Sequence, residues 1–239
     1  MDEENPVLVK MTELLDNWET SNDRRLIFLT CYKLMTQNII NAIETNDFED
    51  VAWVSALMDS FADYYFRALE AYESKQTNLP AAWQIAFNAS HNSRTHIVQD
   101  LVLGVNAHIN YDLVFALAEL LASEWQQLSA EQRQMRYRDH CHVNDIINQT
   151  TNAVQDQVVD RYVPIFGVVD TILGPIDEWM TSLLISEWRE EVWEHALLLV
   201  NLPDPQKRQD LIRHIEETSI QRAKEILGKG GLTGLIEFI

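Results

Sequence analysis

A short polar stretch interrupts the most apolar part of the sequence. The segment VNAHINYDL places His108 and Asp112 four residues apart, with Asn106 and Asn110 at the same spacing beside them. In a helix, residues four apart share a face and are separated by about 6 Å along the axis. A histidine and a carboxylate so placed can bind one metal ion together, or the carboxylate can orient the imidazole for proton transfer.

A second polar cluster, RDHCHVNDIIN, follows further along the chain. Asp139, His142 and Asp145 step by three along one side of a predicted helix. If this helix packs antiparallel to the one that carries His108, two sets of carboxylates and histidines converge inside a bundle, as they do in helical metal sites. The alternative is that Asp139 and its neighbours form a solvated or helix-linking face.

A third cluster, SEWREEVWEHA, places Arg189 beside two glutamates, with tryptophans and a histidine close by. Aromatic residues at helical spacing, Trp83 among them, predict ordinary core packing, and the alternative is a wall on which a ligand stacks. Neither Cys31 nor Cys141 has an obvious base partner, so the sequence gives no sign of a nucleophilic cysteine.

The polar residues between positions 106 and 112 need a structural or a functional reason, because a buried polar group is costly unless it is paired. Three hypotheses stay open for His108 and Asp112. They form a satisfied polar network that only specifies packing, they bind a metal ion, or they act in acid–base catalysis.

The composition describes an acidic protein with enough apolar residues for a large core. Of 239 residues, 46% are hydrophobic, and 37 acidic residues against 18 basic ones give a net charge of −19. Such a surface repels a phosphate backbone, which argues against nucleic acid as a partner. Two cysteines without C-x-x-C spacing, no signal-peptide pattern and no run of about 18 apolar residues predict a cytoplasmic protein without a membrane span.

The elements that position these clusters are predicted to be helices. Glycine and proline are scarce, at seven and six residues, and most stand where the helical period breaks. Apolar residues spaced by three and four predict helices that begin after Asn5, at Ser21 and Asn22, after Asp47 and near Ala81.

The next predicted helix, from about Thr95 to Trp125, is apolar on every side around its polar centre, which is typical of a helix with neighbours all around it. Further helices are expected from Ser129 to Tyr162, from Ile176 to Val200 and from Asp204 to Leu227. The sequence therefore predicts an all-α fold, a single-domain helical bundle over residues 1–239 with a buried central helix.

Five segments between Pro80 and Ala196 share their order and spacing with a known family: PAAWQIAF, LVLGVNAHINYDLVFAL, DHCHVNDIIN, DRYVPIFGVVD and WREEVWEHA. Through these segments the chain resembles the bacterial family DUF5995, and NAHINYDL is the most distinctive of them. The resemblance implies a helical fold and brings no established activity or cofactor with it. It directs attention to Asn106, His108, Asp112, Asn144, Asp145 and Arg189.

On these grounds we assign candidate roles. The candidate metal ligands are His108, Asp112 and His142; the candidate catalytic residues are Asp145 and Arg189; the candidate substrate-binding residues are Asn106, Asn144 and Trp83. The leading hypothesis is an enzyme, a hydrolase by default, in which a divalent zinc, iron or manganese ion activates water. The alternative is a metal-free protein that binds a small, partly apolar molecule in a buried polar pocket.

Overall fold

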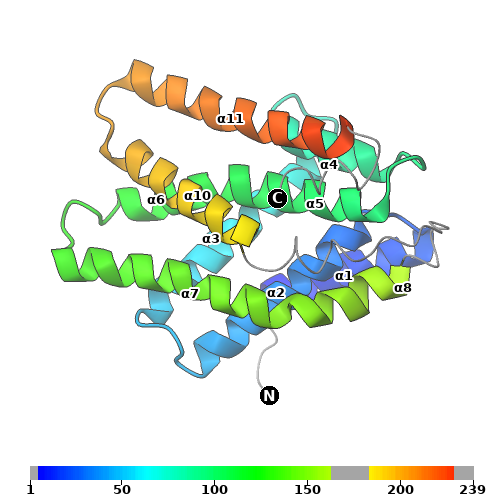
Figure 1. Ribbon diagram of the computed structural model, residues 1–239, viewed down its shortest axis with the longest axis horizontal. Helices are drawn as coiled ribbons and strands as arrows, with labels where there is room; N and C mark the ends of the chain where they lie inside the picture. The colour runs from blue at the N-terminus through cyan, green and yellow to red at the C-terminus, as the bar shows by residue number, and fades with distance from the viewer. Residues whose placement is uncertain (1–4, 163–182, 229–239) are drawn as a thin grey trace.

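The regular structure of the chain is helical throughout the part described by the computed structural model, residues 5–162 and 183–228 (Figure 1). No strand forms within these two ranges. Their helices share one hydrophobic core, which confirms the predicted all-α bundle. The elements are α1 (Pro6–Ser21), α2 (Leu26–Glu44), α3 (Val51–Glu73), α4 (Ala81–Ser90), α5 (Ile97–Ala107), η1 (His108–Leu113), α6 (Val114–Ala122), α7 (Ala130–Val154), η2 (Gln155–Val159), α8 (Asp160–Tyr162), α10 (Leu183–Asn201) and α11 (Pro205–Gly228).

The ends of α1 show one prediction confirmed and one overturned. Asn5 Oδ1 accepts a backbone N–H of α1 at 2.9 Å, and Pro6 is the first helical residue. At the other end, Asn22 adopts a φ of 53°, a left-handed conformation that asparagine tolerates. The predicted start of the second helix at Ser21 and Asn22 is therefore wrong, because Ser21 is the last residue of α1 and α2 begins at Leu26.

A continuous helical rod, made of α5, η1 and α6, runs through the centre of the molecule (Figure 1). It packs against α2, α3, α4, α10 and α11. By length and composition the rod, Ile97–Ala122, is apolar enough to cross a membrane, but 89% of its most apolar window is buried inside the bundle. The prediction of a buried central helix is confirmed.

The rod departs from α-helical geometry at the polar stretch itself. Residues His108–Leu113 form the π-helical segment η1, in which backbone hydrogen bonds span five residues rather than four. Such segments are rare and occur frequently at functional sites. Apolar periodicity predicts a helix here but not this local widening.

The long helix α7 packs mainly against α2 and also contacts α10. In the view of Figure 1 it lies below the rod, whereas α11 lies above it. The conjecture that this helix pairs with the central one is not supported, since α7 packs mainly against α2, and His142 and Asp145 of its polar cluster do not converge with His108 and Asp112. The helix α10 confirms the second part of the helix predicted from Ile176, whose first residues lie outside the described ranges.

Candidate functional site

Three buried side chains form a hydrogen-bonded chain at the middle of the rod. His108 Nδ1 and Asp112 Oδ2 lie 2.9 Å apart within η1, and Trp83 of α4 donates its Nε1–H to the same carboxyl oxygen at 2.8 Å. The side chains of His108 and Asp112 are only 4% and 1% exposed. The structure thus brings together three residues that the sequence singles out, and it uses Trp83 to hold Asp112.

Burial favours the neutral form of both members of this pair. It raises the pKa of Asp112 well above its usual value, an effect that the hydrogen bond from Trp83 only partly offsets. Burial also lowers the pKa of His108 well below its usual value. Burial therefore favours a pair that holds one proton between Nδ1 and Oδ2 and carries no net charge.

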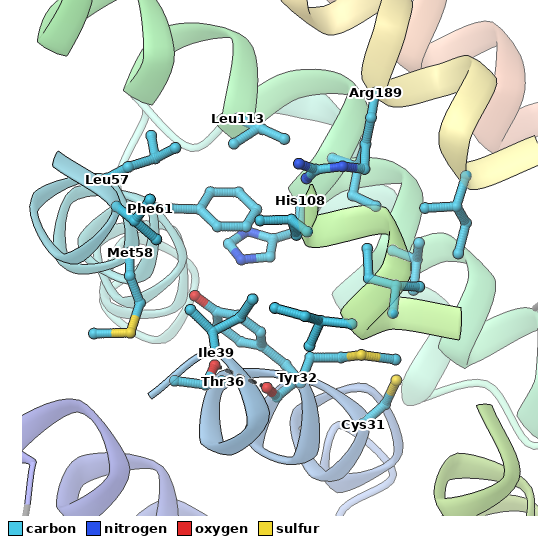
Figure 2. Close-up of a pocket in the computed structure, with 18 of the residues that line it drawn as sticks. Cys31, Tyr32, Thr36, Ile39, Leu57, Met58, Phe61, His108, Leu113 and Arg189 are labelled. Atoms are coloured by element: carbon cyan, nitrogen blue, oxygen red, sulfur yellow. Dashed lines mark hydrogen bonds between the residues drawn. The ribbon is translucent and has the colours of Figure 1, made fainter. Parts of the chain in front are cut away.

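Aromatic rings fix the imidazole of His108 in one orientation. Phe61 stacks almost parallel to it, with ring centroids 3.6 Å apart and an interplanar angle of 8° (Figure 2). Tyr32 meets the same imidazole edge-on at 4.3 Å, and the Tyr65 ring lies 6.1 Å away. Because α2 and α3 supply these rings, the position of His108 depends on helices far from it in the sequence.

Several polar atoms of this cluster have no hydrogen-bond partner in the part of the chain that the structure describes. They are His108 Nε2, Asp112 Oδ1 and the hydroxyls of Tyr32 and Tyr65. Buried polar atoms without partners are uncommon and call for a strained site, a functional one, or a bound water or ion. Sequence reasoning missed the two tyrosines, since their helical spacing predicts ordinary core.

A cavity of about 130 Å³ lies beside the imidazole, between α2, α3, the rod, α7 and α10. Its walls are almost entirely aliphatic and aromatic. His108 and Arg189 supply polar groups to the wall, and Tyr32 and Thr36 line the side formed by α2 (Figure 2). Asp112 is not part of the wall, so it acts on the cavity through His108.

Arg189 enters the cavity wall from α10 and is held there by α7. Its Nε donates to Asn144 Oδ1 at 2.7 Å, and its Nη2 donates to the backbone carbonyl oxygen of His140, also at 2.7 Å. Asn144, a candidate for substrate binding, thus positions Arg189 and does not line the cavity. Both residues belong to the candidate set, and the structure brings them into direct contact.

The tautomer of His140 follows from the same contacts. Its Nε2 lies 3.0 Å from the carbonyl oxygen of Arg189, and a carbonyl only accepts, so Nε2 carries the proton. Its Nδ1, 3.3 Å from Arg189 Nη2, is then an acceptor. Burial and the charge of Arg189 both lower the pKa of His140 well below its usual value. His140 is therefore a neutral acceptor for the guanidinium.

Asn106 faces α11 and does not line the cavity. Its Nδ2 donates to the backbone carbonyl oxygen of Ser219 at 2.9 Å, and Asn110 Nδ2 donates to Asn106 Oδ1 at 3.0 Å. These bonds attach α11 to the rod. The geometry gives Asn106 a structural role and leaves its predicted contact with a substrate without support.

His142 and Asp145 lie apart from the cavity, in a solvent-exposed cluster. His142 Nδ1 is 3.2 Å from Asp145 Oδ2 and its Nε2 is 3.0 Å from Asp47 Oδ2, while the Asp145 side chain is 67% exposed. Partial burial lowers the pKa of His142, but hydrogen bonds to the two carboxylates outweigh it and raise that pKa. The structure does not bring His142 to His108 and Asp112, nor Asp145 to the cavity wall.

Of the two faces considered for Asp139, the structure supports the helix-linking one and not the solvated one, since the residue is only 2% exposed. Its Oδ1 and Oδ2 accept the backbone N–H groups of Glu49 and Asp50, each at 2.8 Å, just before α3 begins. Arg136 is also buried and pairs with Asp50 at 2.6 Å and with Glu124 at 2.9 Å. This side of α7 therefore links helices and satisfies the N-terminus of α3.

The candidate metal ligands do not form a complete set. Within residues 5–162 and 183–228, no three His, Cys, Asp or Glu side chains are placed to hold a metal ion together. His108 and Asp112 remain two adjacent groups already bonded to each other. The hypothesis of a zinc, iron or manganese ion stays a prediction, and elemental analysis of protein purified without chelator or added metal tests it.

Comparison with known proteins connects these residues to one family. The model described as "Family of unknown function (DUF5995)" matches residues 5–229 of the chain. The match extends beyond the five segments that carry the resemblance and includes α1 to α3. No curated protein and no protein of solved structure matches the chain.

Proposed function

The chain belongs to the DUF5995 family, and we propose that it binds a small, largely apolar molecule in the cavity beside His108. The observation that carries the proposal is an apolar space of about 130 Å³ in the bundle interior, with a few fixed polar groups in its wall. Ligand pockets in proteins have this character: mostly hydrophobic, with a small number of placed polar groups that orient the ligand.

The size of the cavity limits the ligand. An engineered protein cavity of about 150 Å³, lined by aliphatic and aromatic side chains, stays dry and binds benzene. A space of about 130 Å³ accommodates, on that scale, a ring or chain of roughly six carbons. Larger molecules require the surrounding helices to move apart.

The polar residues in the cavity wall contribute to binding in different ways. His108, stacked on Phe61 and bonded to Asp112, presents a neutral imidazole that keeps its shape when the cavity is empty. Such a preformed wall reduces the entropy lost on binding. Cys31 also lines the cavity, but burial raises the pKa of its thiol to about 12, so it remains a neutral thiol there.

Titration with a six-carbon alcohol tests the proposal. We expect 1-hexanol to bind saturably, with one molecule per chain by calorimetry, and to raise the melting temperature with the logarithm of its concentration above Kd. Its control is 1,6-hexanediol, which binds more weakly because its second hydroxyl has to lose water in an apolar space. Failure of both 1-hexanol and toluene to bind saturably would falsify the proposal.

A further inference from the structure

The guanidinium of Arg189 is a buried cation with no acidic partner in the described part of the chain. The residue is 4% exposed, and no carboxylate of the described residues lies within ion-pair distance of it. We infer that the cavity ligand is a small monocarboxylate, whose carboxylate binds Arg189 while its hydrocarbon part fills the apolar space. This inference rests on the proposed function and specifies its ligand class.

Arg136 is a buried arginine of the same chain that does pair with carboxylates. It is 8% exposed, similar to Arg189, yet it has carboxylates on both sides, from Asp50 at 2.6 Å and Glu124 at 2.9 Å. With 37 acidic residues in the sequence, carboxylates are plentiful. Among the described residues, Arg189 therefore differs from Arg136, the other buried arginine, in having only neutral neighbours within hydrogen-bonding distance.

The hydrogen bonds of Arg189 involve only two of the three nitrogens of its guanidinium group within the described part of the chain. Nε and Nη2 donate to neutral acceptors, the Asn144 amide and the two acceptors of His140. Nη1 has no hydrogen bond to any described residue, and Figure 2 shows the guanidinium pointing from α10 toward the cavity, near Leu113. His140 cannot compensate the charge, because its ring is neutral.

The cation keeps its charge under physiological conditions. Burial lowers the pKa of Arg189 to about 10, which leaves the guanidinium protonated at neutral pH. An uncompensated buried charge is unfavourable, and a carboxylate relieves it through charge-assisted hydrogen bonds that match the planar fork. One negative charge suffices, which favours a monocarboxylate over a dianionic phosphate ester.

A pair of ligands of equal length tests the inference on the unmodified protein. At pH 7, hexanoate and 1-hexanol have the same number of carbon atoms and differ in the head group, which is a charged carboxylate in one and a neutral hydroxyl in the other. We expect hexanoate to bind at least about tenfold more tightly by calorimetry. Phenyl phosphate is the comparison for a dianionic head group and is expected to bind more weakly than benzoate.

Two variants assign the preference to one residue. Arg189→Met keeps an unbranched side chain but removes the cation, and we expect it to lose the preference for hexanoate over 1-hexanol. Arg222→Met is the matched control, since Arg222 pairs with Glu191 at 2.6 Å on α11 and does not line the cavity. It should keep the full preference for hexanoate. Circular dichroism establishes that each variant is folded.

The outcomes separate the inference from the proposed function. Equal affinity for hexanoate and 1-hexanol in the unmodified protein overturns the inference and leaves the binding cavity standing. A preference that survives in folded Arg189→Met also overturns it. If neither ligand binds the unmodified protein, the proposed function fails as well. The comparison of the two ligands needs no variant, so the inference stays testable if Arg189→Met does not fold.

Discussion

A buried hydrogen bond joins Trp83 Nε1 to Asp112 Oδ2 and thereby ties α4 to the π-helical centre of the rod. The same oxygen meets His108 Nδ1 at 2.9 Å, while Asp112 Oδ1 has no hydrogen-bond partner among the described residues. Since the carboxyl group is almost completely buried, its protonation state determines the charge of the whole site.

Replacing Asp112 by Asn tests whether the buried side chain is a protonated carboxyl group or a carboxylate. Burial raises the folded-state pKa of Asp112 above its ordinary value of 3.8, so the unfolded chain releases this proton at a lower pH than the folded protein does. Asp112 therefore contributes stability below pH 3.8 that is lost as the pH rises toward the folded-state pKa. Asn has no such loss. We expect Asp112→Asn to gain stability relative to the unmodified protein as the pH rises above 3.8 toward the folded-state pKa, by at most about 1.4 kcal/mol per pH unit.

Denaturant unfolding at several pH values measures this difference, and Asp63→Asn is the control because Asp63 is largely exposed and pairs with an arginine, Arg67, rather than with a histidine. The control should follow the unmodified protein across the range. If the difference in stability between Asp112→Asn and the unmodified protein instead stays constant as the pH rises, the folded pair holds no such proton, and the assignment of a protonated Asp112 is wrong.

The residues that sequence reasoning placed correctly are those whose partners are close in the chain or whose pattern repeats. His108 and Asp112 are four apart on one helix, so their contact follows from helical geometry alone. The fully apolar circumference of the surrounding helix predicts its burial in the same way. The pattern within one helix does not predict which neighbouring helix each of its faces contacts, because packing between helices that are distant in sequence determines those contacts.

Arg189 and Asn144 illustrate that limit. Both were candidates for the site, one in catalysis and one in substrate binding, yet their direct contact depends on α7 and α10 meeting side by side. For the same reason the exposed pair of His142 and Asp145 looked equivalent to His108 and Asp112 in sequence. Spacing reveals that two groups share a face, and only the fold reveals whether that face is buried.

Gly104 tests the packing that surrounds the site. The residue lies in α5 against Phe28, and an added Cβ would overlap the Phe28 ring and lie 2.7 Å from its Cβ. Phe28 in turn packs edge-on to His108, with ring centroids 5.8 Å apart. We expect Gly104→Ala to lower the free energy of unfolding by about 1–3 kcal/mol, despite the higher helix propensity of alanine. Unchanged stability would show that Phe28 moves aside freely.

Two aspartates of α7, Asp139 and Asp145, are expected to differ strongly in their contribution to the free energy of unfolding. Its two oxygens accept backbone N–H groups at the start of α3, so Asp139→Asn turns an acceptor into an amide that faces a donor. We expect a loss of about 1–3 kcal/mol in the free energy of unfolding. Asp145→Asn makes the same chemical change at an exposed position of α7 and should alter stability by less than about 0.5 kcal/mol. Equal effects would mean that Asp139 does not cap α3.

Filling the cavity from α7 distinguishes ligand binding from stability. Val143 lines the cavity and is only partly buried, so a larger side chain there can extend into the empty space. We expect Val143→Phe to weaken 1-hexanol binding at least about tenfold, because the ring occupies the space that the ligand needs. The free energy of unfolding of the unliganded protein should change by no more than about 1–2 kcal/mol, because the ring fits in the cavity with an unstrained side-chain conformation. Val200→Phe is the matched control, since Val200 is also partly buried but lies on α10 away from the cavity wall. If folded Val143→Phe binds 1-hexanol as tightly as the unmodified protein does, the ligand lies elsewhere in the bundle. If Val200→Phe loses as much affinity for 1-hexanol as Val143→Phe does, general destabilisation, and not occupancy of the cavity, controls binding.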